Sequence, residues 1–429
     1  MTAVICVAAL TCAAMIVCVL TGAEIKKLHI PLYLVVTVIG AAVVLAAGLL
    51  PLSYAVGALV ADTSVNPIKI LVLFLSITML SVFLDETGFF QYMAAFALQK
   101  AGKSQIKLFI ALYAVVSVLT VFTSNDIIIL TFTPFVCYFC YSAKINPLPY
   151  LLGEFVAANT FSMMLVIGNP TNIYLALAEE ITFGEYFSEM WLPTIFGGLT
   201  AFAVIFAIFY RQLKVKVDCA VPERIPVNKP LSIIGGIHLG ACTVLLALSD
   251  PIGLPMWIIS LGFAVCLFVV VTAYKLIRKE HFHELALTLH RAPWNFVPFL
   301  LSMFIIVTSL EYNGVTRAFA EFLGTENAIP LYGGLSALFS NLVNNIPMSV
   351  FFGSVLSFSG ASSAAAYACI IGSNVGAFLT PVGALAGIMW SSILKRQGVN
   401  LGFGKFVMYG VLICLPTLAA ALAGLWLLA

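Results

Sequence analysis

The residues best suited to chemistry are amides and hydroxyls that interrupt apolar stretches. Residues 339–352 read F-S-N-L-V-N-N-I-P-M-S-V-F-F, so three asparagines, a serine and a proline break an otherwise membrane-grade run. A weaker copy, F-T-S-N-D-I-I-I-L-T-F-T-P, occupies 122–134. Backbone in lipid must satisfy its own hydrogen bonds, so such breaks persist only where they line a protein cavity. Two matching breaks, each carrying Ser-Asn, indicate the binding site of a transporter.

A second interrupted stretch follows each of these breaks. Residues 167–172 read I-G-N-P-T-N, and residues 371–383 contain G-S-N and then T-P-V-G. Broken helices present N-terminal ends that favour anions and carbonyl ends that favour cations. Glycine lets backbone approach a ligand and proline ends a half-helix, although small residues also serve simply to pack membrane helices.

Four polar breaks in two matched pairs favour binding over packing. We expect the tip at 123–126 to face the break at 168–172. We also expect the tip at 340–345 to face 372–374 and 380–383. The predicted substrate- and ion-binding residues are Thr123, Ser124, Asn125, Asp126, Gly168, Asn169, Thr171, Asn172, Ser340, Asn341, Asn344, Asn345, Gly372, Ser373, Asn374, Thr380, Pro381 and Gly383.

Asp126 and Glu154 are the two of the 18 acidic residues that fall inside apolar segments rather than in loops or at span ends. An ionisable group within a membrane is costly and is a functional hypothesis by default. Both residues are therefore proton-coupling candidates, and Asp126 could instead ligate a cation. The alternative for Asp126 is capping of the helix that follows it. The alternative for Glu154 is contact with cytoplasmic water, one or two turns into its span.

The polar breaks carry no fixed positive charge. Segments 108–141, 148–177, 328–356 and 361–393 contain no Lys, Arg or His. A multiply charged anion would need helix ends and co-bound cations, so a small neutral hydroxylated solute, or an anion carried with sodium, fits better. Because no metal-ligand spacing, nucleotide-binding motif or buried nucleophile–base pair is visible, we expect no enzyme activity, metal, cofactor or nucleic-acid partner.

The elements that position these residues are membrane spans. The chain has 429 residues, is 62% hydrophobic and 9% charged, and has a mean hydropathy of +1.10, whereas soluble domains are about 25% charged. Two stretches, 108–141 and 328–356, are broken in their middle and are predicted to be re-entrant hairpins. Predicted spans of roughly 20 residues lie at 3–21, 30–50, 67–84, 148–177, 191–210, 231–248, 255–273, 294–310, 361–393 and 404–428.

The basic residues orient these spans. With both termini outside the cell, all of the 20 Lys and Arg except Lys69 and Arg317 fall inside. The positive-inside rule selects this arrangement. We therefore expect a multi-pass protein of the cell (inner) membrane, with its polar segment 211–230 as a cytoplasmic linker.

The linker divides the chain into two similar halves. Leu84-Asp85-Glu86-Thr87-Gly88 in the first half matches Leu310-Glu311-Tyr312-Asn313-Gly314 in the second. Five spans and one hairpin per half invert the second half in the membrane, which is typical of secondary transporters. The predicted fold is an all-α polytopic membrane protein with helices broken at the midplane. Its inverted repeats are 1–210, with hairpin 108–141 and broken span 148–177, and 231–429, with hairpin 328–356 and broken span 361–393.

Four motifs carry a family resemblance, in the same order and over nearly the whole chain. They are F-L-D-E-T-G-F-F (83–90), R-A-P-W (291–294), S-N-L-V-N-N-I-P (340–347) and L-T-P-V-G-A-L-A-G-I-M-W (379–390). The sequence resembles the ion transporter superfamily, and within it the arsenite/antimonite permeases and their citrate-transporter-like relatives. The resemblance implies an elevator-type carrier whose scaffold forms a homodimer and which is coupled to H⁺ or Na⁺.

The details of the motifs leave two substrates open. Arsenite permeases typically have Ala-Asn-Asp-Gly where this chain has S-N-D-I (124–127). They also usually have an acidic residue at the position that Asn374 occupies in this chain. The Ser-Asn tips resemble those of sodium-coupled dicarboxylate carriers.

The leading hypothesis is a secondary active antiporter that exports a small oxyacid such as As(OH)₃ against protons. Asn125, Asn341, Asn344 and Asn345 would bind the solute, helped by Ser124, Ser340 and Thr380, and Asp126 would carry the proton. The alternative is a sodium- or proton-coupled symporter of citrate, a dicarboxylate or an inorganic anion such as sulfate, with sodium near the carbonyls of Gly168 and Gly372. A channel subunit for an ATPase partner is a third hypothesis.

Overall fold

The computed structural model describes residues 1–429 except 26–29, 64, 217–226 and 429, and its described part is almost wholly helical. The exception to the predicted all-α fold is a short antiparallel pair, β1 (Glu24–Ile25) with β2 (Ile30–Pro31). Eight helices of the described part are long and apolar enough to cross a membrane. The helices outside the predicted hairpins and broken spans are α1 (Thr2–Thr21), α2 (Leu32–Ala46), α3 (Leu52–Val60), α4 (Pro67–Glu86), α5 (Phe89–Ala101), α10 (Phe183–Leu213), α11 (Lys229–Ala247), α12 (Met256–Arg278), α13 (His283–Arg291), α14 (Phe296–Tyr312), α15 (Val315–Leu323) and α20 (Phe403–Trp426).

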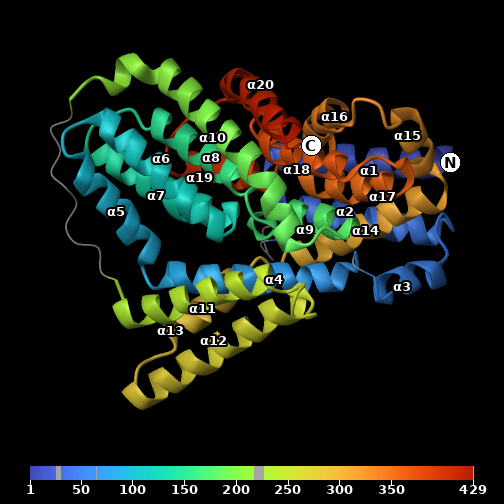
Figure 1. Cartoon of the computed structure of the whole chain (residues 1–429), viewed down its shortest axis with the longest axis horizontal. Coiled ribbons are helices and arrows are strands. Elements are labelled where there is room, and N and C mark those ends of the chain that lie inside the picture. The colour runs from blue at the N-terminus through green and yellow to red at the C-terminus, as the bar shows by residue number, and fades with distance from the viewer. Residues whose placement is uncertain (26–29, 64, 217–226, 429) are drawn as a thin grey trace.

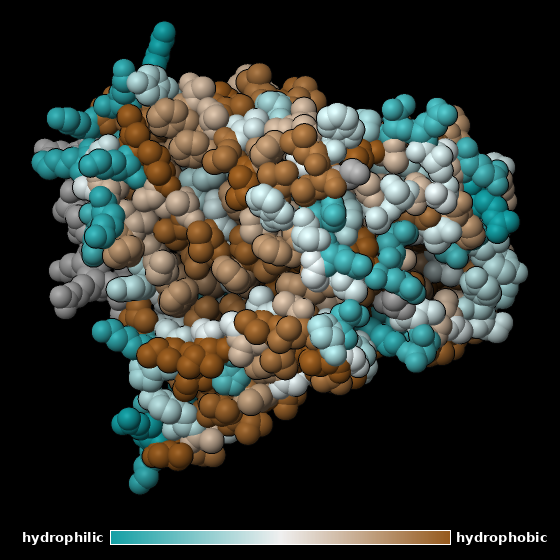
Figure 2. Space-filling view, viewed as in Figure 1, coloured by the Kyte–Doolittle hydropathy of each residue, from teal (hydrophilic) through white to brown (hydrophobic). Residues whose placement is uncertain are grey.

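Helix α4 runs across the molecule and is packed on several sides (Figure 1). Helices α11, α12 and α13 pack against it below, and α9 (Pro170–Ala178) lies beside it. Figure 2 shows hydrophobic side chains over the middle of this face and polar side chains toward its left and right edges. This distribution suits a protein whose middle section is surrounded by lipid.

Two predicted boundaries differ from the structure. The span expected at 191–210 belongs to α10, which begins eight residues earlier because Thr182 and Glu185 form a capping box at its start. The stretch expected as one span at 30–50 ends as α2 at Ala46, and α3 follows it separately. Only the ends of the predicted linker 211–230 can be compared, because 217–226 lie outside the described residues.

Each predicted hairpin consists of two helices joined by a very short turn. In the first, α6 (Gln105–Phe122) and α7 (Asn125–Ser142) are separated by Thr123 and Ser124. In the second, α16 (Ala328–Val343) and α17 (Asn345–Ser359) are separated by Asn344 alone, at φ +76°. The side chains of Ser124 and Asn344 accept hydrogen bonds from the first turn of the following helix, so the polar interruptions start the second arms.

The two broken spans are interrupted at different places. The first comprises α8 (Leu148–Phe161), the short 3₁₀-helix η1 (Val166–Gly168) and α9. The second comprises α18 (Ser363–Gly376) and α19 (Leu385–Arg396). The break expected to begin at Gly372 therefore begins after Gly376, and Gly372, Ser373 and Asn374 are helical.

Helix packing explains why α18 continues past Gly372. A Cβ on Gly376 would lie 2.8 Å from the carbonyl oxygen of Ala337 on α16, and one on Gly372 would overlap the carbonyl of Gly333. These glycines let two membrane helices approach closely. The alternative of simple helix packing thus describes Gly372.

Matching glycines turn the chain in each half. Gly88 (φ 83°) caps the start of α5, and Gly314 (φ 76°) caps the start of α15. Both lie in the left-handed region, which favours glycine. The matched motifs at 84–88 and 310–314 therefore have the same local geometry.

Candidate functional site

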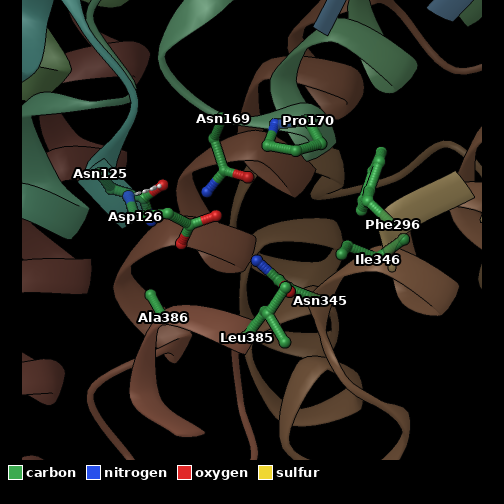
Figure 3. Close-up of a pocket in the computed structure, with 9 residues that line it drawn as sticks. All are labelled: Asn125, Asp126, Asn169, Pro170, Phe296, Asn345, Ile346, Leu385 and Ala386. Atoms are coloured by element: carbon green, nitrogen blue, oxygen red, sulfur yellow. Dashed lines mark hydrogen bonds between the residues drawn. The ribbon is translucent and has the colours of Figure 1, made fainter. Parts of the chain in front are cut away.

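A polar pocket forms where several helices begin (Figure 3). Every lining residue caps a helix or occupies its first two positions, on α7, α9, α14, α17 and α19. Segments from both halves of the chain therefore meet at one site. The lining residues are Asn125, Asp126, Asn169, Pro170, Phe296, Asn345, Ile346, Leu385 and Ala386.

Helix N-termini give this pocket a positive electrostatic character. The first turn of a helix has backbone N–H groups without intrahelical partners and carries a partial positive charge. Part of this donor capacity is already used, because Asn125 Oδ1 accepts from the Asp126 N–H at 3.0 Å and Asn169 Oδ1 accepts from the Thr171 N–H at 3.3 Å. Among the residues that line the pocket, Asp126 is the ionisable one.

Three polar side chains project toward one another in the pocket. Figure 3 shows the carboxyl group of Asp126 and the amides of Asn169 and Asn345 directed into the same space. Asn345 is 3% exposed, and its Oδ1 has no hydrogen-bond partner in the described part of the chain. Because an unpaired buried polar atom costs about 1–3 kcal/mol, this oxygen is placed for a ligand or a water molecule.

The first tip is held by a residue that the sequence analysis missed. Asn125 Nδ2 donates to Asn159 Oδ1 on α8 at 3.1 Å, and Asn159 Nδ2 donates to the carbonyl of Phe155 at 2.8 Å. Thr123 and Ser124 use their hydroxyls elsewhere, since Thr123 Oγ1 donates to the Leu119 carbonyl and Ser124 caps α7. Asp126 also lies in the first turn of α7, so its helix-capping alternative and its place in the pocket coexist.

Asn374 joins the two broken spans in a buried network. Its Oδ1 accepts from Ser162 Oγ and Asn169 Nδ2, both at 3.0 Å, and its Nδ2 donates to Asn172 Oδ1 at 2.8 Å. All four side chains are buried. At Gly168 a methyl group would overlap the carbonyl of Ser162, so this glycine serves the close turn of the first break.

The second tip holds the second break in place. Asn341 Nδ2 donates to the Gly376 carbonyl at 2.8 Å, and its Oδ1 accepts from Thr380 Oγ1 at 2.7 Å. Asn344 Nδ2 donates to the Val382 carbonyl at 2.9 Å.

Several predicted site residues thus support the pocket from outside its lining. The side chains of Asn341, Asn344 and Thr380 fix the non-helical backbone before α19, and Asn344 also caps α17. These residues therefore position α17 and α19. Outside the lining lie Thr123, Ser124, Gly168, Thr171, Asn172, Ser340, Asn341, Asn344, Gly372, Ser373, Asn374, Thr380, Pro381 and Gly383.

Glu154 lies away from the pocket. Its side chain is 2% exposed and accepts a hydrogen bond from Thr133 Oγ1 at 2.8 Å. The alternative that it reaches water is therefore wrong, because α7 covers this face of α8. Glu154 is therefore a buried carboxyl group that does not contact the pocket.

Sequence reasoning also missed a buried ion pair at the end of α4. Asp85 Oδ2 lies 2.8 Å from Arg291 Nη2, and Arg291 also pairs with Glu86. Asp85 is 2% exposed, although it was expected at a span end. The two motifs that contain these residues, 83–90 and 291–294, lie far apart in the chain, so only their charges could have indicated the contact.

Comparison with known proteins places the chain in a family. Residues 4–372 match the family model described as citrate transporter. The arsenical pump membrane protein of Escherichia coli (strain K12) is 27% identical over 372 residues, covering 82% of this chain and 84% of that protein. A putative arsenical pump membrane protein of Bacillus subtilis (strain 168) is 24% identical, covering 79% and 83%. An uncharacterized transporter of Mycobacterium tuberculosis (strain ATCC 25618 / H37Rv) is 24% identical, covering 83% and 85%.

A solved structure supports the same fold. The YdaH transporter of Alcanivorax borkumensis, whose topology is described as unusual, superimposes with a TM-score of 0.58 at 15% identity and covers 87% of each chain. The predicted resemblance to arsenite permeases and citrate-transporter-like proteins is confirmed, and the protein is a transporter rather than an enzyme. Because the family model matches most of its length, this multi-pass membrane protein belongs to the citrate transporter family.

Proposed function

We propose that this protein is a secondary active transporter that exports a small neutral oxyacid, of the arsenite or antimonite type, in exchange for protons. One observation carries the proposal. The pocket combines asparagine amides with a single carboxyl group at the starts of several helices, and its lining contains no Lys, Arg or His. Such a site suits a solute with several hydroxyls and no net charge.

The amides provide the solute contacts. A trihydroxy oxyacid donates and accepts through each hydroxyl, and an amide offers both a carbonyl acceptor and two N–H donors. Asn169 and Asn345 project into the pocket with Asn125 at its edge. Asn341 and Asn344 act one step further out, by holding the break that places Leu385 and Ala386.

Asp126 is the proton carrier in this proposal. Its carboxyl group projects into the same space as the amides of Asn169 and Asn345. The ionised carboxylate would accept a hydrogen bond from a solute hydroxyl, and protonation of Asp126 removes that acceptor. Protonation of Asp126 and solute binding therefore exclude each other, as an antiporter requires. Glu154, the other candidate, does not line the pocket and is assigned no coupling role.

The transport movement follows from the proposed fold. Residues 1–210 and 231–429 form inverted repeats, and the hairpins and broken spans move together as an elevator against a scaffold that forms a homodimer. Both termini lie outside the cell and the linker 211–230 is cytoplasmic. The matching motifs at 84–88 and 310–314, whose Gly88 and Gly314 cap the following helices in the same left-handed conformation, support the inverted repeats.

A second candidate is uptake of a carboxylate or inorganic anion with sodium or protons. The convergence of helix N-termini favours it, since such ends attract anions. The family model described as citrate transporter favours it as well. In this case a cation would neutralise Asp126 while the anion is bound.

Everted membrane vesicles that contain the protein distinguish these functions. Arsenite uptake would be measured with a proton gradient, with a sodium gradient and with neither. The proposal expects accumulation driven by the proton gradient alone, and vesicles without the protein provide the background. Absence of arsenite movement under every gradient would refute the proposal, and sodium-driven movement of citrate, succinate, sulfate or phosphate would establish the second candidate. Arsenite flux that follows its own gradient without counterflow would instead indicate a channel that needs an ATPase partner.

A further inference from the structure

A second and wider recess, here called the vestibule, opens at the other end of α9. Its lining includes Asp62, Lys69, Leu73, Leu177, Asp250 and Trp257, from the starts of α4 and α12, the end of α9 and the loops beside them. The binding pocket includes Pro170, the first residue of α9, and the vestibule includes Leu177 near its end. Seven residues of helix separate the two recesses by about 10 Å.

An aromatic pair lies between the vestibule and the pocket. Helix α4 packs beside α9, and its Leu73 lines the vestibule. The next residue, Phe74, contacts Phe296 with ring centroids 4.6 Å apart. Phe296 in turn lines the pocket, and both rings are 3% exposed. Leu73 precedes Phe74 in the chain, and Phe74 contacts Phe296. These three apolar residues therefore connect the lining of the vestibule with the lining of the pocket.

The end of α13, which leads into α14, is tied to the end of α4. Arg291, five residues before Phe296, forms ion pairs with Asp85 and Glu86 at the end of α4. Truncation of such a charge cluster is costly, so α4 and the start of α14 are held in a defined relation. Both members of the aromatic pair therefore lie on helices, next to segments that ion pairs hold together.

We infer that Phe74 and Phe296 form the apolar barrier that closes the binding pocket from the vestibule. An apolar constriction excludes water and makes passage of ions and polar solutes unfavourable. The barrier prevents solute and protons from crossing between the two recesses while the pocket lies against Phe296. When the pocket moves away from this wall, its contents meet the vestibule. This assignment rests on the proposed role of the pocket as the transport site.

Thiol labelling in sealed vesicles tests the barrier without reference to any substrate. Ala386→Cys places a thiol in the pocket, and Thr63→Cys places one in the vestibule. Thr63→Cys identifies the side of the membrane from which an impermeant maleimide enters the vestibule. From that side, labelling of Ala386→Cys is expected to be slow in the parent and to rise about tenfold or more with Phe74→Ala or Phe296→Ala, because reactivity follows the accessible fraction. Labelling of the native cysteines is measured in the matching proteins that carry Phe74→Ala or Phe296→Ala but no introduced cysteine, and it is subtracted.

Control variants separate loss of the barrier from loss of the fold. Leu71→Ala truncates another buried side chain of α4 that lines neither recess, and it should leave labelling unchanged. Phe74→Leu retains apolar bulk and should restore protection. Rapid labelling in the parent from the vestibule side, or equal labelling of Phe74→Ala and Leu71→Ala, would overturn the inference. If the barrier result holds but the parent moves no arsenite, the proposed function fails while the barrier stands.

Discussion

Replacing Asn374 with alanine tests how the two broken spans are held together. Asn374 Oδ1 accepts from Ser162 Oγ and Asn169 Nδ2 at 3.0 Å, and its Nδ2 donates to Asn172 Oδ1 at 2.8 Å. The alanine variant removes these partners from groups that are buried. Asn169 lines the pocket, so we expect the change to reduce both stability and transport.

The size of the effect follows from the number of groups left without partners. A buried polar group that loses its partner costs about 1–3 kcal/mol, whereas an interhelical hydrogen bond in a membrane protein contributes about 0.6 kcal/mol on average. Two such groups bound the cost between about 1 and 6 kcal/mol. They are the Asn169 amide nitrogen and the Asn172 oxygen, which keeps only a long contact of 3.5 Å from Thr171 Oγ1. We expect about 3 kcal/mol, since water does not reach these buried groups.

Unfolding of the purified protein in mixed detergent micelles, titrated with a denaturing detergent, measures this difference. The adjacent Ser373 provides a matched control, because it is equally buried and its Oγ has no hydrogen-bond partner among the described residues. Ser373→Ala should change the free energy of unfolding by less than about 1 kcal/mol. Equal unfolding midpoints for Asn374→Ala and Ser373→Ala would refute the network as a source of stability.

Three further predictions concern coupling, packing and charge. Asp126→Asn is expected to abolish proton-driven accumulation in vesicles while counterflow continues, whereas Glu154→Gln, outside the pocket, should retain accumulation; the reverse result would move coupling to Glu154. Gly376→Ala should cost about 1–3 kcal/mol by overpacking, because its Cβ would lie 2.7 Å from Ser340 Oγ. Gly334→Ala should leave the stability unchanged, because no heavy atom lies within 4 Å of its Cβ. Equal thermal unfolding of Gly376→Ala and Gly334→Ala would contradict close packing of α16 and α18. Arg291→Ala leaves a buried carboxylate unpaired and should cost about 1–3 kcal/mol, below the fully buried range because the guanidinium is 35% exposed; an unchanged denaturation midpoint would show that the ion pair contributes nothing.

The helical content and the polar interruptions follow directly from the sequence. A bilayer requires about 20 apolar residues per span and tolerates polar backbone only inside protein. For this reason the apolar runs became helices, and the interruptions at 123–124 and 344 became turns between them. The tip asparagines Asn125 and Asn345 and the break residue Asn169 also lie together as the pattern predicts.

Only the tertiary structure decides which polar residues face the pocket. Asn345 lines it while Asn344, its neighbour, holds the second break, because a single residue turns the chain between α16 and α17. Apolar residues such as Phe296 and Leu385 carry no local signal of a site, since they resemble any membrane-facing residue in sequence. The sequence by itself therefore determined the spans and their polar breaks, through the demands of the bilayer on each segment. The pocket and its apolar barrier depend on contacts between distant segments, and no local pattern records these contacts.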